Sequence, residues 1–269
     1  MKKEIFTFWE PKENMPAYIR LCIKTWEKFL PDYKIHILSY ENLNEFLSKS
    51  FDKSLYKNFS LPKQADAIRC ALLKENGGIW LDCDTIITSP DIRNILDINS
   101  QLVMIGNHLA FIKSEKNSKI LKYWYKKLIN NINFYKTHKF QTNKLFYFLE
   151  SVFHPKLHKN LDSWNYLGNL ILKKALKTKN KKLFYKINKF EINAFPELKE
   201  NKNIEDLTKN YQNFYYNNDF SKEVLENTKG IILLHNSWTP SEYLSMSNEE
   251  FLQKNCTLSN ILKDLLLFS

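Results

Sequence analysis

The sequence predicts an α/β fold in which helices cover a mostly parallel central sheet. Short apolar runs alternate along the chain with stretches whose apolar residues recur at helical spacing, and this order favours parallel strands joined by helical crossovers. The 269 residues suit one medium-sized domain, and an apolar content of 43% is sufficient for a sizeable core. We therefore expect residues 1–269 to form a single domain with a helical insertion at approximately residues 115–185.

The first elements alternate between strand and helix. Residues 4–9 read as a strand, and residues 15–30 read as a helix because apolar side chains recur every three or four positions before Pro31. A second strand is expected at residues 33–38. A longer helix should follow at residues 61–76, with Pro62 in its first turn and the pair Gly77-Gly78 as its stop signal.

A buried strand then delivers two carboxylates to its own carboxyl end. The apolar run Ile79–Leu81 leads into Asp82-Cys83-Asp84, and apolar residues resume at Ile86. Two carboxylates one residue apart cannot both be buried without a counter-charge, because desolvating each ion is costly. Mn²⁺ or Mg²⁺ is the expected cofactor, since both ions accept oxygen ligands and bridge to phosphates. The alternative for so short a pattern is a solvated turn that binds nothing.

The remaining elements are read from the same patterns. A strand is expected at residues 101–105, followed by amphipathic helices within residues 120–132, 140–153 and 164–176 that make up the insertion. Late strands are expected at residues 190–195, 212–216 and 230–234, and an amphipathic helix at residues 252–268. The strand at residues 230–234 ends at His235-Asn236-Ser237-Trp238, which places polar and aromatic groups at a second strand end.

The composition narrows the choice of partners. Lys and Arg number 40 and Asp and Glu number 29, which gives a formal charge of +11. Only three of the basic residues are arginines. This balance favours phosphorylated donors, an anionic glycan acceptor and peripheral contact with the inner membrane surface. A basic nucleic-acid-binding protein is the competing reading, but no helix-turn-helix, zinc knuckle or aromatic RNA-binding motif supports it, so we expect no nucleic-acid partner.

The expected location is the cytoplasm. No apolar run approaches the roughly 18 residues of a membrane span, and Met1-Lys2-Lys3 leads straight into a strand. The four cysteines are scattered without a C-x-x-C pair, which argues against a zinc site and a disulfide scaffold.

The central motif resembles a known enzyme family. Ala65-Asp66 and Arg69 on a helix, followed by Gly77-Gly78-Ile79-Trp80-Leu81 and Asp82-Cys83-Asp84, resemble the signature of glycosyltransferase family 32 with its "DXD sugar-binding region". Bacterial capsular-polysaccharide and lipooligosaccharide transferases are the nearest members. The resemblance implies a Rossmann-like glycosyltransferase type A fold that moves a hexose from a nucleotide diphosphate sugar, expected to be a UDP-sugar, to a glycan or glycolipid acceptor with retention of configuration.

The resemblance also implies roles for individual residues. Asp82, Asp84 and His235 would hold the metal ion, with Asn236 as the alternative third ligand. Asp82, Asp84 and Arg69 would be catalytic. The expected donor contacts are Trp9, Asp66, Arg69, Asn107, Asn236, Ser237 and Trp238, and the helical insertion is the expected acceptor side.

A phosphatase is the competing enzymatic reading of the same carboxylates. Asp82-Cys83-Asp84-Thr85-Ile86 also fits the haloacid-dehalogenase motif, in which the first Asp attacks phosphorus and the second is a general acid. That class needs a later strand that ends in a paired acidic motif for Mg²⁺, and no D-D or G-D-x-x-x-D motif follows in the sequence.

Overall fold

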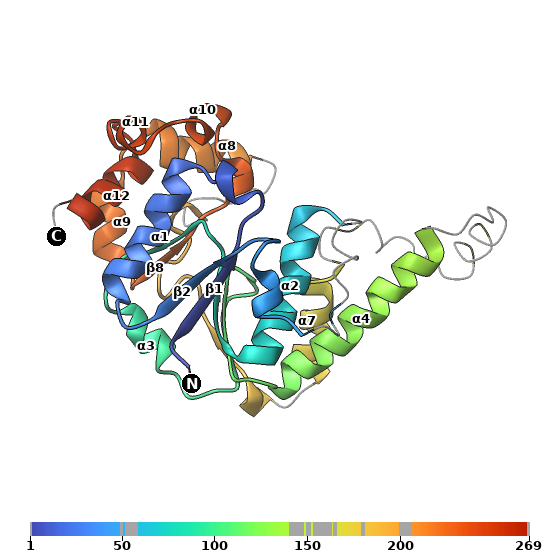
Figure 1. The fold of residues 1–269 in the computed structure, drawn as a ribbon. Coiled ribbons are helices and arrows are strands. Elements are labelled where there is room, and N and C mark those ends of the chain that lie inside the picture. The colour runs from blue at the N-terminus through green and yellow to red at the C-terminus, as the bar shows by residue number, and fades with distance from the viewer. Residues whose placement is uncertain are drawn as a thin grey trace. The chain divides into compact units, whose positions relative to one another are not determined.

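The computed structural model describes residues 2–48, 51, 59–139, 148, 152, 163, 166–178, 181–198 and 206–267 (Figure 1). The strands are β1 (Glu4–Phe8), β2 (Lys34–Leu38), β3 (Gly78–Leu81), β4 (Thr85–Ile87), β5 (Leu102–Ile105), β6 (Phe111–Ser114), β7 (Tyr185–Ile187) and β8 (Ile231–Leu233). The α-helices are α1 (Ala17–Phe29), α2 (Leu61–Asn76), α3 (Ile92–Leu96), α4 (Lys119–Lys139), α7 (Asn169–Thr178), α8 (Leu207–Gln212), α9 (Ser221–Asn227), α10 (Ser241–Leu244), α11 (Asn248–Leu252) and α12 (Thr257–Leu267). The shorter helical turns are η1 (Lys12–Asn14), η2 (Leu43–Glu45), η4 (Lys181–Leu183), η5 (Pro196–Leu198), η6 (Asn213–Asn217) and η7 (Asn236–Trp238).

The chain divides into two compact units. The first contains Met1–Lys2, Tyr40–Ile79 and Ser100–Tyr185, and the second contains Lys3–Ser39, Trp80–Asn99 and Lys186–Ser269. We describe each unit by itself below.

The strands confirm the predicted α/β class with its mostly parallel central sheet. In the second unit β1 pairs in parallel with β2, in a register that runs from Glu4 opposite Lys34 to Phe8 opposite Leu38, and the next strand beside β1 is β3 (Figure 1). In the first unit β5 pairs antiparallel with β6. A separate antiparallel pair, β4 with β8, belongs to the second unit.

Helix α1 anchors the β4–β8 pair in the second unit. Its apolar residues face inward at helical spacing, and Pro16 immediately precedes its first residue. The fully buried Trp26 donates its indole N–H to the carbonyl of Thr85, at 2.7 Å. Thr25 accepts a hydrogen bond from the amide of Ile87, at 3.0 Å. These two contacts hold the strand that follows the acidic motif.

Helix α2 has the predicted bounds because its end signals are local. Pro62 lies in the first turn, and Gly77 follows the last residue with φ +71°, a left-handed conformation that glycine adopts without strain. A Cβ atom at Gly77 would lie 2.7 Å from the amide nitrogen of Lys116 in the same unit. Gly77 is therefore required both by the turn and by the chain that passes beside it.

Two predicted strands are wrong. Residues 190–195 form turns, and residues 212–216 lie at the end of α8 and in the π-helical turn η6. The buried Tyr215 and Tyr216 of the second segment, together with Tyr211 just before it, are spaced as one face of a helix. Aromatic content suggested strands there, but the spacing of the buried rings favours a helix.

The insertion is helical where the structure describes it. Helix α4 contains the predicted helix at residues 120–132, and α7 contains the second half of the one predicted at 164–176. The predicted helix at 140–153 lies outside the described residues except for Phe148 and Val152, which are helical. Within the described residues no helix is long and apolar enough to cross a membrane.

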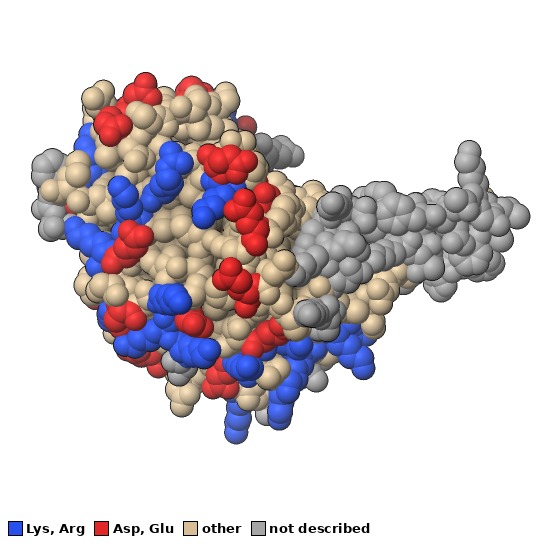
Figure 2. All heavy atoms as spheres, in the orientation of Figure 1, with Lys and Arg blue, Asp and Glu red and all other residues tan. Residues whose placement is uncertain are grey.

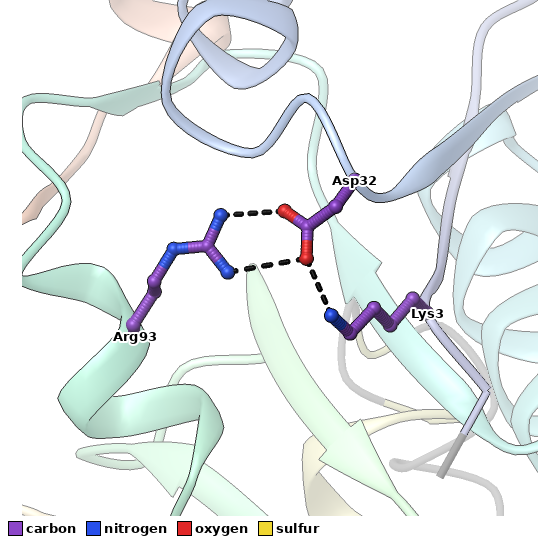
Figure 3. Close-up of polar contacts among 3 residues, drawn as sticks. All are labelled: Lys3, Asp32 and Arg93. Atoms are coloured by element: carbon purple, nitrogen blue, oxygen red, sulfur yellow. Dashed lines mark hydrogen bonds and ion pairs between the residues drawn. The ribbon is translucent and has the colours of Figure 1, made fainter.

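The edge of the second unit carries an exposed ionic cluster. Asp32 accepts hydrogen bonds from Lys3, at 2.6 Å, and from both terminal nitrogens of Arg93 (Figure 3). The Arg93 guanidinium and the Lys3 ammonium hold the pKa of the Asp32 carboxyl well below its usual range. Such exposed ion pairs contribute little to stability, and none of these three residues is among the predicted site residues.

Candidate functional site

The two carboxylates lie in the turn between β3 and β4, as the sequence predicts. Asp82 follows the last residue of β3, and its backbone carbonyl accepts a hydrogen bond from the amide of Thr85, at 3.0 Å. The Asp82 carboxylate accepts the indole N–H of the buried Trp80, at 2.7 Å. Both Asp82 and Asp84 are half-buried, so the turn presents two charges that keep partial access to solvent.

The residue between them points the opposite way. The thiol of Cys83 is buried and lies 3.0 Å from the hydroxyl of Thr7 on β1. Burial raises the pKa of this thiol well above its usual range, so Cys83 stays protonated and is a packing residue. In this turn Cys83 is thus buried, whereas Asp82 and Asp84 on either side of it keep partial access to solvent.

The end of β8 meets this turn directly. The backbone N–H of Asn236 donates to the carboxylate of Asp84, at 2.7 Å, and the N–H of Leu234 donates to the Asp84 carbonyl, at 3.3 Å. These bonds place the strand end that carries His235 beside the acidic turn. Asp84 is therefore held in one orientation by the backbone of a segment far along the chain.

A set of tyrosines supports the segment that follows β8. The hydroxyl of the buried Tyr18 on α1 donates to the side-chain carbonyl of Asn236 and lies 3.0 Å from the hydroxyl of Thr239. Tyr216 contacts the same Thr239 hydroxyl, at 2.9 Å. Burial raises the pKa of the Tyr18 hydroxyl well above its usual range, so it remains a hydrogen-bond donor.

His235 is enclosed by aromatic rings and a carboxylate. Its ring centroid lies 4.1 Å from that of Trp238 and 5.6 Å from those of Phe195 and Tyr211. Its Nε2 atom lies 3.7 Å from a carboxylate oxygen of Glu197, whose side chain is fully buried. The structure therefore directs one imidazole nitrogen of His235 toward Glu197.

Glu197 is a residue that the sequence alone did not single out. It lies in η5 and accepts the hydroxyl hydrogen of the buried Tyr215, at 2.9 Å. Burial raises the pKa of its carboxyl to about 7, although the bond from Tyr215 and the charge of Lys189 act in the opposite direction. No sequence motif surrounds it, and only the pattern of buried aromatics nearby marks the region.

The remaining expected donor contacts of the second unit are Trp9, Ser237 and Trp238. Trp9 is half-buried directly after β1, with its backbone N–H bonded to the carbonyl of Leu38 at 3.0 Å. Ser237 is exposed in η7. Trp238 is half-buried, and its carbonyl accepts the side-chain amide of Gln212, at 3.0 Å. The roles of these side chains toward a donor stay predictions.

Asp66, Arg69 and Asn107 belong to the first unit. Asp66 and Arg69 lie on α2, their side chains pair at 3.2 Å, and both residues are buried. The chain at Gly168 passes so close that a Cβ there would lie 2.0 Å from the Asp66 carboxylate. Asn107 is exposed in the turn after β5. The ion pair is thus an enclosed feature of this unit and not a pair on a helix surface.

The donor chemistry of the β3–β4 turn fits a hard divalent ion. Asp82 and Asp84 are carboxylates with partial access to solvent, and oxygen ligands of this kind suit Mn²⁺ and Mg²⁺. Across the part of the chain that the structure describes, no three His, Cys, Asp or Glu side chains are placed together to hold a metal ion. The complete ligand set of Asp82, Asp84 and His235 therefore stays a prediction.

Comparison with known proteins assigns the chain to a family. Residues 1–254 match the family described as "Capsular polysaccharide synthesis protein". The chain belongs to this family.

One similar protein is a mannosyltransferase from yeast. The initiation-specific alpha-1,6-mannosyltransferase of Saccharomyces cerevisiae is 26% identical over 123 residues, which are 39% of this chain and 26% of that protein. The family match confirms the predicted relationship to proteins of capsular polysaccharide synthesis, and neither this match nor the relative favours the phosphatase. The chain spans about a quarter of the length of that relative.

Two solved structures are similar at a low level. A glycosyltransferase involved in the glycosylation of the major capsid of PBCV-1 is 11% identical, with a TM-score of 0.40, over 90% of this chain and 96% of that one. The apo form of the glycosyltransferase GlyE of Streptococcus pneumoniae TIGR4 is 13% identical, with a TM-score of 0.43, over 98% of this chain and 63% of that one.

Proposed function

We propose that this member of the capsular polysaccharide synthesis family is a metal-dependent glycosyltransferase of the type A fold. It would transfer a hexose, with retention, from a UDP-sugar or similar donor to a hydroxyl of a surface glycan such as capsule or lipooligosaccharide. The observation that carries the proposal is the bond between the Asn236 amide and the Asp84 carboxylate, because it joins the acidic turn to the polar strand end. The name of the yeast relative supports a hexose as the transferred group.

The second unit would hold the leaving diphosphate. Asp82 and Asp84 would be the ligands of a Mn²⁺ or Mg²⁺ ion, with His235 as the proposed third ligand and Asn236 as the alternative. When bound, such an ion would neutralise charge that develops on the leaving diphosphate. The amide of Asn236 would keep the Asp84 carboxylate in its binding orientation. Ser237 and Trp238 would contact the diphosphate.

Other residues would bind the rest of the donor. Trp9 would stack on the base, and Asn107 would line the donor-sugar pocket. Asp66 would accept hydrogen bonds from sugar hydroxyls, and Arg69, which pairs with it at 3.2 Å, would orient that carboxylate. We also propose that the enzyme works at the cytoplasmic face of the inner membrane, where nucleotide sugars are available.

The test replaces Asp84 with asparagine, which has nearly the same shape as aspartate but carries no charge. Asp84→Asn keeps an oxygen that can accept the Asn236 amide but removes the carboxylate charge. We expect UDP binding in the presence of Mn²⁺, measured by calorimetry, to weaken by more than about tenfold, which corresponds to about 1.4 kcal/mol. Thermal unfolding without metal should stay close to that of the wild type.

The matched control is Asp91→Asn, an exposed carboxylate in the same unit. It removes one negative charge without touching the β3–β4 turn and should leave UDP binding unchanged. If Asp84→Asn bound UDP with the same Mn²⁺ dependence as the wild type, the proposed metal site would be wrong.

A further inference from the structure

A pocket lies between α4 and α7 in the first unit, within the insertion that is the expected acceptor side. Its volume is about 260 Å³, and its walls include Tyr123, Lys127 and Asn131 from α4 and Lys174 from α7. The α4 residues are four positions apart, so they form one stripe on the helix. Tyr166, which precedes α7, closes the pocket together with two aliphatic side chains of α7.

The floor of the pocket is held in place by buried hydrogen bonds. The indole N–H of the fully buried Trp124 donates to the carbonyl of Leu167, at 2.8 Å. Asn131 donates its side-chain amide to the carbonyl of Tyr166, at 3.2 Å, and the Tyr166 hydroxyl donates back to the carbonyl of Asn131, at 3.0 Å. These contacts fasten the start of α7 onto α4, so the pocket is formed before any ligand binds.

The pocket is surrounded by positive charge. Lys127 and Lys174 are exposed at its rim, one from each helix. Neither α4 nor α7 contains an aspartate or a glutamate. Among the side chains that the structure describes on the two helices, five more lysines are exposed: Lys119, Lys122, Lys126, Lys173 and Lys177. Figure 2 shows Lys and Arg side chains along the edge of the molecule where α4 lies. An anion in the pocket would reduce the repulsion between these ammonium groups.

The lining also has the chemistry that recognises a sugar. The ring of Tyr123 offers an apolar face, and the ammonium of Lys127 lies 6.0 Å from its centroid. The side-chain amide of Asn131 has a second hydrogen in addition to the one given to Tyr166. A pocket that combines an aromatic face, an amide and two ammonium groups suits a sugar ring that bears a carboxylate.

We propose that the α4–α7 pocket binds an acidic sugar residue of the glycan acceptor, with its carboxylate held between Lys127 and Lys174. This inference rests on the proposed function in one respect, namely that the acceptor is a glycan. It narrows the anionic glycan acceptor expected from the charge to a chain that contains uronic-acid-like sugars, and it assigns one of those sugars to a defined pocket of the insertion.

The experiment compares two double variants that remove the same charge from the same helices. Lys127→Met with Lys174→Met changes the pocket, whereas Lys126→Met with Lys173→Met changes exposed lysines that do not line it. Methionine keeps most of the aliphatic stem of lysine. Calorimetry would measure the binding of an oligogalacturonate, which carries a carboxylate on each sugar, and of a neutral maltooligosaccharide.

We expect the wild type to bind the acidic oligosaccharide more tightly than the neutral one. The pocket variant should lose about tenfold or more of this affinity, because each ammonium forms a charged hydrogen bond. The affinity of the control variant should stay within about twofold of the wild type, because its lost charges act on the ligand only at longer range and through screening solvent. Thermal unfolding of both variants checks that the fold is intact.

Other outcomes would overturn the proposal. Equal losses in the two variants would mean that the lysines act as a diffuse charge and not as a site. A wild type that prefers the neutral oligosaccharide, or that binds only anionic vesicles or an oligonucleotide, would exclude an acidic sugar. UDP binding with Mn²⁺, measured on the same proteins, separates the acceptor pocket from the proposed donor site. Loss of UDP binding in the pocket variant would indicate general damage to the protein. Absence of UDP binding in the wild type would refute the donor site and leave the acceptor pocket untouched.

Discussion

Replacement of Glu197 by glutamine should make the protein more stable at neutral and alkaline pH. Glu197 is 3% exposed, and burial raises the pKa of its carboxyl from 4.5 to about 7. In the unfolded chain the carboxyl loses its proton near pH 4.5, whereas in the folded protein it keeps the proton until about pH 7. Between these values the folded state binds more protons than the unfolded state, so stability falls as the pH rises.

The size of the effect follows from the same two values. Each pKa unit corresponds to about 1.4 kcal/mol, so the difference between 4.5 and about 7 amounts to roughly 3 kcal/mol. This stability is fully present below pH 4.5 and is lost once the pH has passed about 7. Glutamine does not ionise, and its side-chain oxygen can still accept the hydroxyl of Tyr215.

Urea unfolding of the wild type and of Glu197→Gln at several pH values between about 5 and 8 provides the test. The free energy of unfolding of the variant, relative to the wild type, should rise with pH and reach a plateau roughly 3 kcal/mol higher. Glu191→Gln, which removes an exposed carboxylate from the same segment, controls for the loss of one charge. A difference that stays flat, or that falls with pH, would show that the ionised Glu197 is stabilised by His235 and would refute the reasoning.

Two further substitutions test the packing of each unit. Gly168→Ala should lower the free energy of unfolding by about 1–3 kcal/mol, because its Cβ would lie 2.0 Å from the Asp66 carboxylate and 2.7 Å from Leu109. Unchanged urea unfolding would mean that this chain segment moves aside without cost. Trp26→Phe should cost about 1–3 kcal/mol, because it removes the donor to the Thr85 carbonyl at 2.7 Å in a fully buried setting. A loss below about 0.5 kcal/mol would indicate that β4 does not depend on this bond.

Local signals in the sequence determined the elements that carry the acidic motif. Helix α2 begins and ends where Pro62 and Gly77 predict, because capping and turn formation depend on neighbouring residues. The carboxylates follow β3 because an apolar run ends where charged residues begin. The strands predicted at residues 190–195 and 212–216 were wrong, since short aromatic segments suit either a strand or a buried helical face until their neighbours are known.

Only the tertiary structure decided how the site is assembled. The bond from the Asn236 amide to Asp84 joins residues that are 152 positions apart, and Glu197 reaches His235 from a turn that no motif marks. Asp66 and Arg69 proved to be buried, because the chain near Gly168 passes directly over Asp66. A sequence pattern reports which faces of a segment are apolar, but contacts between distant segments depend on how the whole core packs. The residues that orient the carboxylates and enclose the histidine can therefore be identified only from the folded structure and not from the sequence.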